Sequence, residues 1–217
     1  MRVIAFGDIH MEYGELARIP GLAEADLVIV TGDFTNFGGE KEAEKVLGAI
    51  RRYNGKILAV PGNLDQPEVA GMLHARGINL HADGVMLGET GIVGVGGSNP
   101  TPFNTPTEFP EERLAALMEK GLEKVREAKR LILVSHAPPV DTATDRIPSG
   151  AHVGSRAVRD FIERHRPLFC LTGHIHEARG TDRIGETLVL NPGMLSHPGW
   201  IELEETDGGE WTAVIRP

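Results

Sequence analysis

Residues 3–10 read VIAFGDIH, a short apolar run that ends in a glycine, a carboxylate and an imidazole. The apolar part has the length and β-branched content of a buried strand, and the glycine allows a sharp exit from it. Apolar runs that are likewise followed by residues able to bind metal occur at residues 27–33 (LVIVTGD), 57–65 (ILAVPGNLD), 131–136 (LILVSH) and 168–176 (LFCLTGHIH). Our interpretation of both fold and function starts from these five blocks, each a strand followed by residues that can bind metal.

The rest of the chain predicts an α/β protein, because short Val-, Ile- and Leu-rich runs alternate with segments of helical period. Strands are expected over residues 3–6, 27–31, 57–60, 85–87, 92–95, 131–135, 168–172, 188–190, 200–203 and 211–215. Helices are expected over residues 40–53, 67–76, 108–128 and 155–165. The last four strands have little helix between them, so we expect antiparallel pairing there. The helix and connector histidines His74, His81 and His165 are expected to be exposed.

Composition and charge narrow the classes of function. The 217 residues are 41% hydrophobic and 24% charged, which is typical of a folded globular protein. We expect a single domain over residues 1–217. With 22 Lys and Arg against 31 Asp and Glu, the net charge of −9 argues against long nucleic acid as a partner.

The chain shows no sign of export or of a membrane span. Its apolar runs are far shorter than the roughly 20 residues that cross a bilayer, and the N-terminal run is too short for a signal peptide. The single cysteine, Cys170, lies in an apolar run, which fits a buried thiol in a reducing compartment. We therefore expect a cytoplasmic protein without a membrane partner.

The five blocks predict a metal site, because the carboxyl ends of strands in open α/β sheets are where ligands bind. Seven side chains are candidate ligands: Asp8, His10, Asp33, Asn63, His136, His174 and His176. Seven ligands exceed the needs of one tetrahedral zinc but suit two ions about 3.5 to 4 Å apart. Imidazoles favour Mn, Fe, Co, Ni or Zn over Mg or Ca. One histidine at a strand end is commonly structural, whereas five such ends together point to phosphoester hydrolysis by a metal-bridging hydroxide.

From Gly7 to Gly193 the ordered blocks resemble the calcineurin-like metallophosphoesterases. This resemblance implies a four-layer α/β/β/α sandwich of mixed sheets and two divalent transition-metal ions, with Mn favoured. It implies that Asp8, His10, Asp33 and His176 hold the first metal, and that Asp33, Asn63, His136 and His174 hold the second. Asp33 would bridge the two ions. The segments around His136, His152 and His174 resemble the branch that contains cyclic-nucleotide phosphodiesterases.

One position departs from the family pattern. The third block of the family usually reads Gly-Asn-His followed by an acid, whereas this chain has Leu64 in place of the histidine. Leucine cannot protonate a leaving group, and the loss of a general acid costs about 100- to 10,000-fold in rate for a poor leaving group. We therefore expect a phosphodiesterase acting on a small diester, with a nucleotide among the candidate substrates. Asn63 would stabilise the negative oxygens.

Other residues are candidates for leaving-group assistance and substrate binding. His152 lies in the loop after His136 and could assist the leaving oxygen, although a solvated loop histidine is an equal alternative. Asn99 and Asn104, in the Gly- and Pro-rich loop after residue 95, could contact a ribose or base, or could simply form turns.

The absence of a histidine at position 64 is also compatible with two other functions. The first is a protein-binding scaffold that retains the metal site but has weak catalysis, as in a retromer subunit of this family that also lacks this histidine. The intact set of seven ligands argues against it. The second is a nuclease on long nucleic acid, which the acidic charge makes the least favoured.

Overall fold

The computed structural model describes residues 1–197 and 199–217 and places their strands in two mixed sheets. The first sheet has the order β11-β10-β1-β2-β3 and the second the order β4-β5-β6-β7-β9-β8. The strands are β1 (Arg2–Phe6), β2 (Leu27–Val30), β3 (Ile57–Ala59), β4 (Asp83–Leu87), β5 (Thr90–Val95), β6 (Arg130–Ser135), β7 (Phe169–Leu171), β8 (Gly180–Ile184), β9 (Thr187–Asn191), β10 (Trp200–Glu205) and β11 (Trp211–Arg216). The α-helices are α1 (Glu40–Arg51), α2 (Glu68–Ala75), α3 (Glu111–Lys124) and α4 (Arg156–His165), and the 3-10 helices are η1 (Tyr13–Arg18) and η2 (His176–Ala178).

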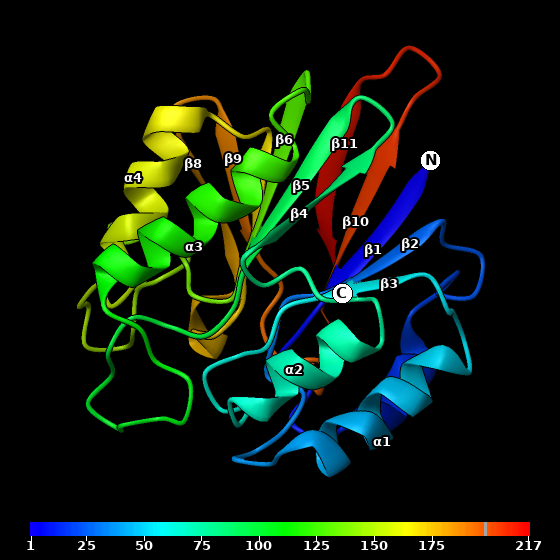
Figure 1. Ribbon diagram of the computed structural model, residues 1–217, viewed down its shortest axis with the longest axis vertical. Helices are drawn as coiled ribbons and strands as arrows, with labels where there is room; N and C mark the ends of the chain where they lie inside the picture. The colour runs from blue at the N-terminus through cyan, green and yellow to red at the C-terminus, as the bar shows by residue number, and fades with distance from the viewer. Residues whose placement is uncertain (198) are drawn as a thin grey trace.

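The strands alternate their side chains between separate apolar cores, which creates four layers. In β1, Ile4 and Phe6 pack in a core with α1 and α2, whereas Val3 and Ala5 face the second sheet. In β6, Leu133 packs in a third core with α3 and α4. Figure 1 shows α1 and α2 covering the first sheet and α3 and α4 covering the second. The predicted α/β/β/α sandwich of mixed sheets is confirmed.

The parallel strands position the five blocks. Strands β1, β2 and β3 are parallel in the first sheet, and β5, β6, β7 and β9 are parallel in the second. All the residues expected to bind metal therefore follow carboxyl ends of parallel strands. The segments that follow β2, β6 and β7 are hydrogen-bonded to one another through His136, which follows β6. Its side chain contacts the Thr31 carbonyl after β2, and its backbone carbonyl accepts a hydrogen bond from the Gly173 N–H after β7.

The structure corrects three expectations. Strand β7 pairs parallel with β9, because an unpredicted strand, β8, lies between them in the chain and pairs antiparallel with β9. Helix α3 is shorter than expected at both ends and begins after Pro110. His81 and His165 are partly buried, since His81 accepts a hydrogen bond from Gly96 N–H and His165 contacts Glu119.

Two further expectations concern the burial of Cys170 and helices that could cross a membrane. The Cys170 thiol is free and fully buried. Across the described residues, every helix is too short or too polar to span a bilayer.

Candidate metal centre

Four of the seven predicted ligands form one tight cluster. The ligand atoms of Asp8, His10, Asp33 and His176 all lie within 4.8 Å of one another. His176 Nε2 lies 3.2 Å from Asp8 Oδ1 and 3.1 Å from His10 Nε2. These residues follow β1, β2 and β7, so the cluster draws on both sheets.

Two more predicted ligands lie close to Asp33 and to each other. His136 Nε2 is 2.9 Å from Asn63 Oδ1 and 3.4 Å from Asp33 Oδ2. The same Asp33 oxygen is 3.9 Å from His10 Nε2, so it faces both groups of ligands. The seventh candidate, His174, places its ring 5.2 Å from that of His136, measured between ring centroids.

Hydrogen bonds orient His136 toward these oxygens. Its Nδ1 donates to the Thr31 carbonyl at 2.9 Å, which leaves Nε2 facing only acceptors, the oxygens of Asn63 and Asp33. Burial alone would lower the pKa of His136, but the charges of Asp33 and Asp8 and these contacts raise it to about 9. Nε2 of His136 therefore faces two oxygens, and a divalent metal ion can replace a proton at such a nitrogen.

The clustered donor atoms fit divalent transition metals. Nε2 of His10 and Nε2 of His176 face each other beside two carboxylates, and His10 Nδ1 is buried with no hydrogen-bond partner among the described residues. Mixed imidazole and carboxylate ligands suit Mn, Fe, Co, Ni or Zn. In the metal-free protein, burial and the charge of His136 lower the pKa of His174 to about 4, so its ring is neutral and able to bind metal.

The backbone is strained where the ligands leave the strands. Asp8, His10, Asp33 and His174 have φ angles of 48°, 47°, 49° and 69°, values that residues other than glycine rarely adopt. Such strain is concentrated at functional sites. A glycine before Asn63 also permits close approach, because a Cβ on Gly62 would lie 2.0 Å from Asp33 Oδ1.

Asp65 is a structural residue of the site that sequence reasoning left without a role. Its buried carboxylate accepts from the backbone N–H groups of Phe34, Thr35 and Gly62 and from the Thr35 hydroxyl, at 2.9 to 3.2 Å. These bonds tie the β2 exit to the β3 exit. Burial and the charge of Asp33 raise the pKa of Asp65 to about 7. The sequence feature that could have revealed the role of Asp65 is its place as the acidic residue that ends the Gly-Asn-x-Asp block.

The predicted catalytic and substrate-binding residues outside the cluster lie on its neighbouring loops. His152 Nδ1 lies 2.6 Å from buried Asp145 Oδ1, and no hydrogen bond or ion pair links His152 to the seven ligands in the described structure. Asn99 donates to the Val153 carbonyl at 3.2 Å and so joins the two loops. Asn104 is exposed with φ 50°, a conformation that asparagine tolerates in turns.

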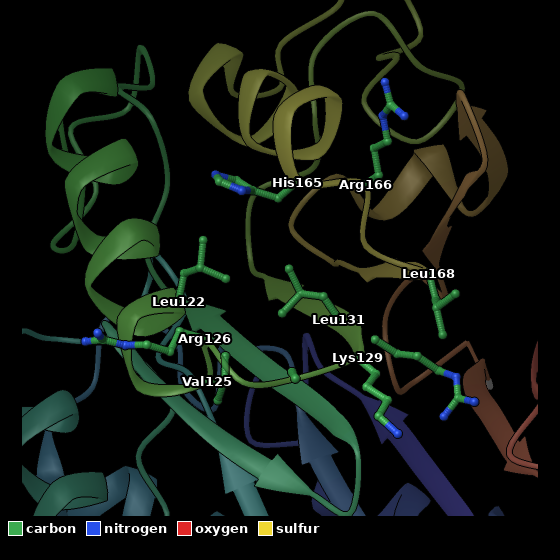
Figure 2. Close-up of a pocket in the computed structure, with 10 residues that line it drawn as sticks. Leu122, Val125, Arg126, Lys129, Leu131, His165, Arg166 and Leu168 are labelled. Atoms are coloured by element: carbon green, nitrogen blue, oxygen red, sulfur yellow. The ribbon is translucent and has the colours of Figure 1, made fainter.

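A separate hollow of about 250 Å³ lies away from this centre. Leu122, Val125, Leu131 and Leu168 form part of its lining, with Arg126, Lys129 and Arg166 at its edge (Figure 2). It borders the amino ends of β6 and β7, whereas the metal ligands follow their carboxyl ends.

The fold and the centre together define an α/β sandwich protein with a candidate metal site at the junction of its two sheets. A model of the calcineurin-like phosphoesterase family matches residues 1–178, and the chain belongs to this family. Its sequence is 38% identical to Uncharacterized protein MJ1162 of Methanocaldococcus jannaschii over 205 residues, which cover 91% of this chain and 90% of that protein. It is 25% identical to the probable glycerophosphodiester phosphodiesterase GpdQ of Arcobacter nitrofigilis, over 97% of this chain and 78% of that protein.

Solved structures share the fold. Protein TT1561 of Thermus thermophilus aligns with a TM-score of 0.72 at 18% identity and covers 98% of this chain and 97% of its own. A dimetal phosphatase from Danio rerio aligns with a TM-score of 0.64 at 11% identity, over 94% of this chain and 92% of its own.

Proposed function

We propose that this metallophosphoesterase binds two divalent metal ions and hydrolyses small phosphodiesters, with Mn²⁺ as the favoured metal. The observation that carries this proposal is the position of Asp33 Oδ2, which is 3.9 Å from His10 Nε2 and 3.4 Å from His136 Nε2. A single carboxylate oxygen facing two sets of imidazoles is suited to bridge two cations. The name of the Danio rerio relative, a dimetal phosphatase, supports the same arrangement.

In this proposal Asp8, His10, Asp33 and His176 hold the first ion, and Asp33, Asn63, His136 and His174 hold the second. Two divalent ions bound there would supply an activated water at neutral pH and would neutralise the charge of a phosphoryl group. The Leu64 N–H donates to Asp33 Oδ1 at 2.8 Å and so holds the bridging carboxylate by its other oxygen. Asn63 would help to stabilise the negative oxygens of the phosphoryl group.

The proposed preference for diesters follows from the lack of a proton donor for the leaving group at position 64. Leu64 supplies no proton, so a substrate that needs strong protonation reacts slowly unless another group assists. We propose His152 for this role, because Asp145 holds its Nδ1 and its side chain is still 35% exposed. The name of GpdQ, a probable glycerophosphodiester phosphodiesterase, supports the diester class.

For the substrate we propose a small diester, with a nucleotide among the candidates and with Asn99 and Asn104 among its contacts. Phe103, in the same loop, is 79% exposed and could stack on a flat base. We propose a cytoplasmic location, which the free buried Cys170 supports.

The test is Mn²⁺-dependent hydrolysis of bis(p-nitrophenyl) phosphate beside the monoester p-nitrophenyl phosphate, with Asp33→Asn as the control. We expect diester turnover that exceeds monoester turnover and that Asp33→Asn abolishes. His152→Ala should slow an unactivated diester far more than the activated one. Absence of turnover with Mn²⁺, Fe²⁺, Co²⁺, Ni²⁺ and Zn²⁺ would contradict the proposal and favour the protein-binding scaffold.

A further inference from the structure

We infer that Thr105 and Glu108 are positioning residues that orient the Asn63 amide and thereby set the affinity of the second metal site. The second metal site here means Asp33, Asn63, His136 and His174. The inference deepens the proposed function and rests on it, since it concerns the ligand oxygen of one of the two proposed sites.

A chain of hydrogen bonds leads from Glu108 to Asn63. Asn63 Nδ2 lies 3.0 Å from Thr105 Oγ1, and Thr105 Oγ1 lies 2.6 Å from Glu108 Oε1. At the other end of the amide, Asn63 Oδ1 is 2.9 Å from His136 Nε2. Asn63 is 3% exposed and Thr105 is 9% exposed, so water competes little for these bonds.

The chemistry of Glu108 fixes the direction of this chain. Partial burial opposes ionisation, but hydrogen bonds from Thr101 and Thr105 outweigh it and hold the pKa of Glu108 below its ordinary value. An ionised carboxylate only accepts, so the Thr105 hydroxyl must donate to Glu108. The lone pairs of that hydroxyl then accept from the Asn63 amide nitrogen.

This direction decides which end of the Asn63 amide faces the metal ligands. With Nδ2 held by Thr105, Oδ1 points toward His136, where a second metal ion would need an oxygen ligand. In the flipped amide an NH₂ group would face the cation, and two oxygens would compete for the single hydroxyl hydrogen of Thr105. Groups behind a ligand that fix its orientation typically change metal affinity by about 10- to 100-fold.

Glu108 also ties this site to the loop that bears Phe103. Its Oε1 accepts from the Thr101 hydroxyl at 2.6 Å and from the Thr105 N–H at 2.7 Å, and Phe103 N–H donates to Thr101 Oγ1. The loop and the second metal site therefore share one carboxylate anchor, which makes the loop conformation depend on the same bonds.

The test is a calorimetric titration of the metal-free protein with Mn²⁺ alone. We expect two ions to bind the wild-type chain. Thr105→Val should weaken one of the two sites about 10- to 100-fold and leave the other within about threefold. Thr105→Ser keeps the hydroxyl and should restore the wild-type affinity. Thr107→Val is the matched control, because this buried hydroxyl donates to the Asp65 carbonyl, while the bond of the Thr107 N–H with the Asn63 carbonyl is made by the backbone and survives the substitution. Thr105→Ala replaces Thr105→Val if the valine variant does not fold.

The outcomes separate this inference from the proposed function. If wild-type protein binds two ions and Thr105→Val binds both with unchanged affinity, the positioning role is wrong and the dinuclear proposal stands. Equal loss in Thr105→Ser, or in Thr107→Val, would also overturn the role, because the loss would then not follow the hydroxyl. A wild-type chain that binds fewer than two ions would contradict the proposed function itself.

Discussion

Asp33 approaches Gly62 so closely that any side chain at position 62 would displace it. A Cβ on this glycine would lie 2.0 Å from Asp33 Oδ1 and 2.2 Å from the Asp33 amide nitrogen, both impossible distances. Asp65 accepts the Gly62 N–H at 2.9 Å, so the glycine itself has little freedom to move away. The position of Asp33, the proposed bridging ligand, therefore depends on the absence of one methyl group.

We expect Gly62→Ala to lose metal binding and to lower the free energy of unfolding by about 1 to 3 kcal/mol, the usual cost of overpacking. Denaturant unfolding and the metal content after dialysis against Mn²⁺ check both effects. Wild-type metal content in Gly62→Ala would show that Asp33 does not need this close approach.

A second residue-scale prediction concerns acid stability and His81. Burial, helped by the charges of Arg113 and Lys120, lowers the pKa of His81 to about 4 from 6.5, and its Nδ1 accepts the Gly96 N–H at 2.9 Å. The unfolded chain takes up this proton near pH 6.5 and the folded chain only near pH 4. The contribution of neutral His81 is therefore complete above pH 6.5 and is lost as the pH falls from 6.5 to 4.

We expect His81→Asn, which keeps an acceptor at this position, to remove up to about 3 kcal/mol of this pH dependence. Urea unfolding of both proteins across that pH range measures it. Parallel stability curves for the wild-type and variant proteins would refute the assignment. Both proteins are compared without metal, because metal binding itself changes stability with pH.

At the scale of elements, α1 offers a simple test of how helices cover the first sheet. Val46, Leu47 and Ile50 are fully buried against that sheet, while Gly48 is exposed and has open space where a Cβ would stand. Gly48→Ala should raise the free energy of unfolding by about 0.5 to 1 kcal/mol, because alanine restricts the unfolded chain and favours helix. A loss of stability in chemical denaturation would show that α1 packs differently.

Elements with a strong apolar pattern could be predicted, and those without one could not. The buried runs of β1, β2, β5 and β6 and all four α-helices lie where the sequence placed them, within a few residues. Strand β8 was missed because Gly180, Thr181, Asp182 and Arg183 give it almost no apolar content. Without β8, the parallel pairing of β7 with β9 could not be foreseen either.

At the scale of the whole molecule, the two sheets share one apolar core. Val3 and Ile29 of the first sheet pack in the same cluster as Ile132 and Leu171 of the second. We therefore propose that residues 1–217 form a single domain and expect one cooperative unfolding transition. Calorimetric and van't Hoff enthalpies should agree. Two separate transitions would assign the sheets to separate folding units.

The convergence of the candidate metal ligands could be predicted because they follow strands, whose ends meet by topology. Thr105 and Asp145 could not, because loops 94–106 and 137–154 carry no periodicity that shows what they touch, and Glu108 could not, because it was expected to begin a helix that in fact starts at Glu111. Their roles follow only from hydrogen bonds between residues distant in sequence, such as the bond of Asn63 with Thr105.

The most direct test of the central claim is anomalous diffraction from crystals grown with Mn²⁺. We predict two peaks about 3.5 to 4 Å apart. One should lie among Asp8, His10, Asp33 and His176 and the other among Asp33, Asn63, His136 and His174. Both peaks should vanish in Asp33→Asn. A single peak, or peaks that do not share Asp33, would contradict the dinuclear centre.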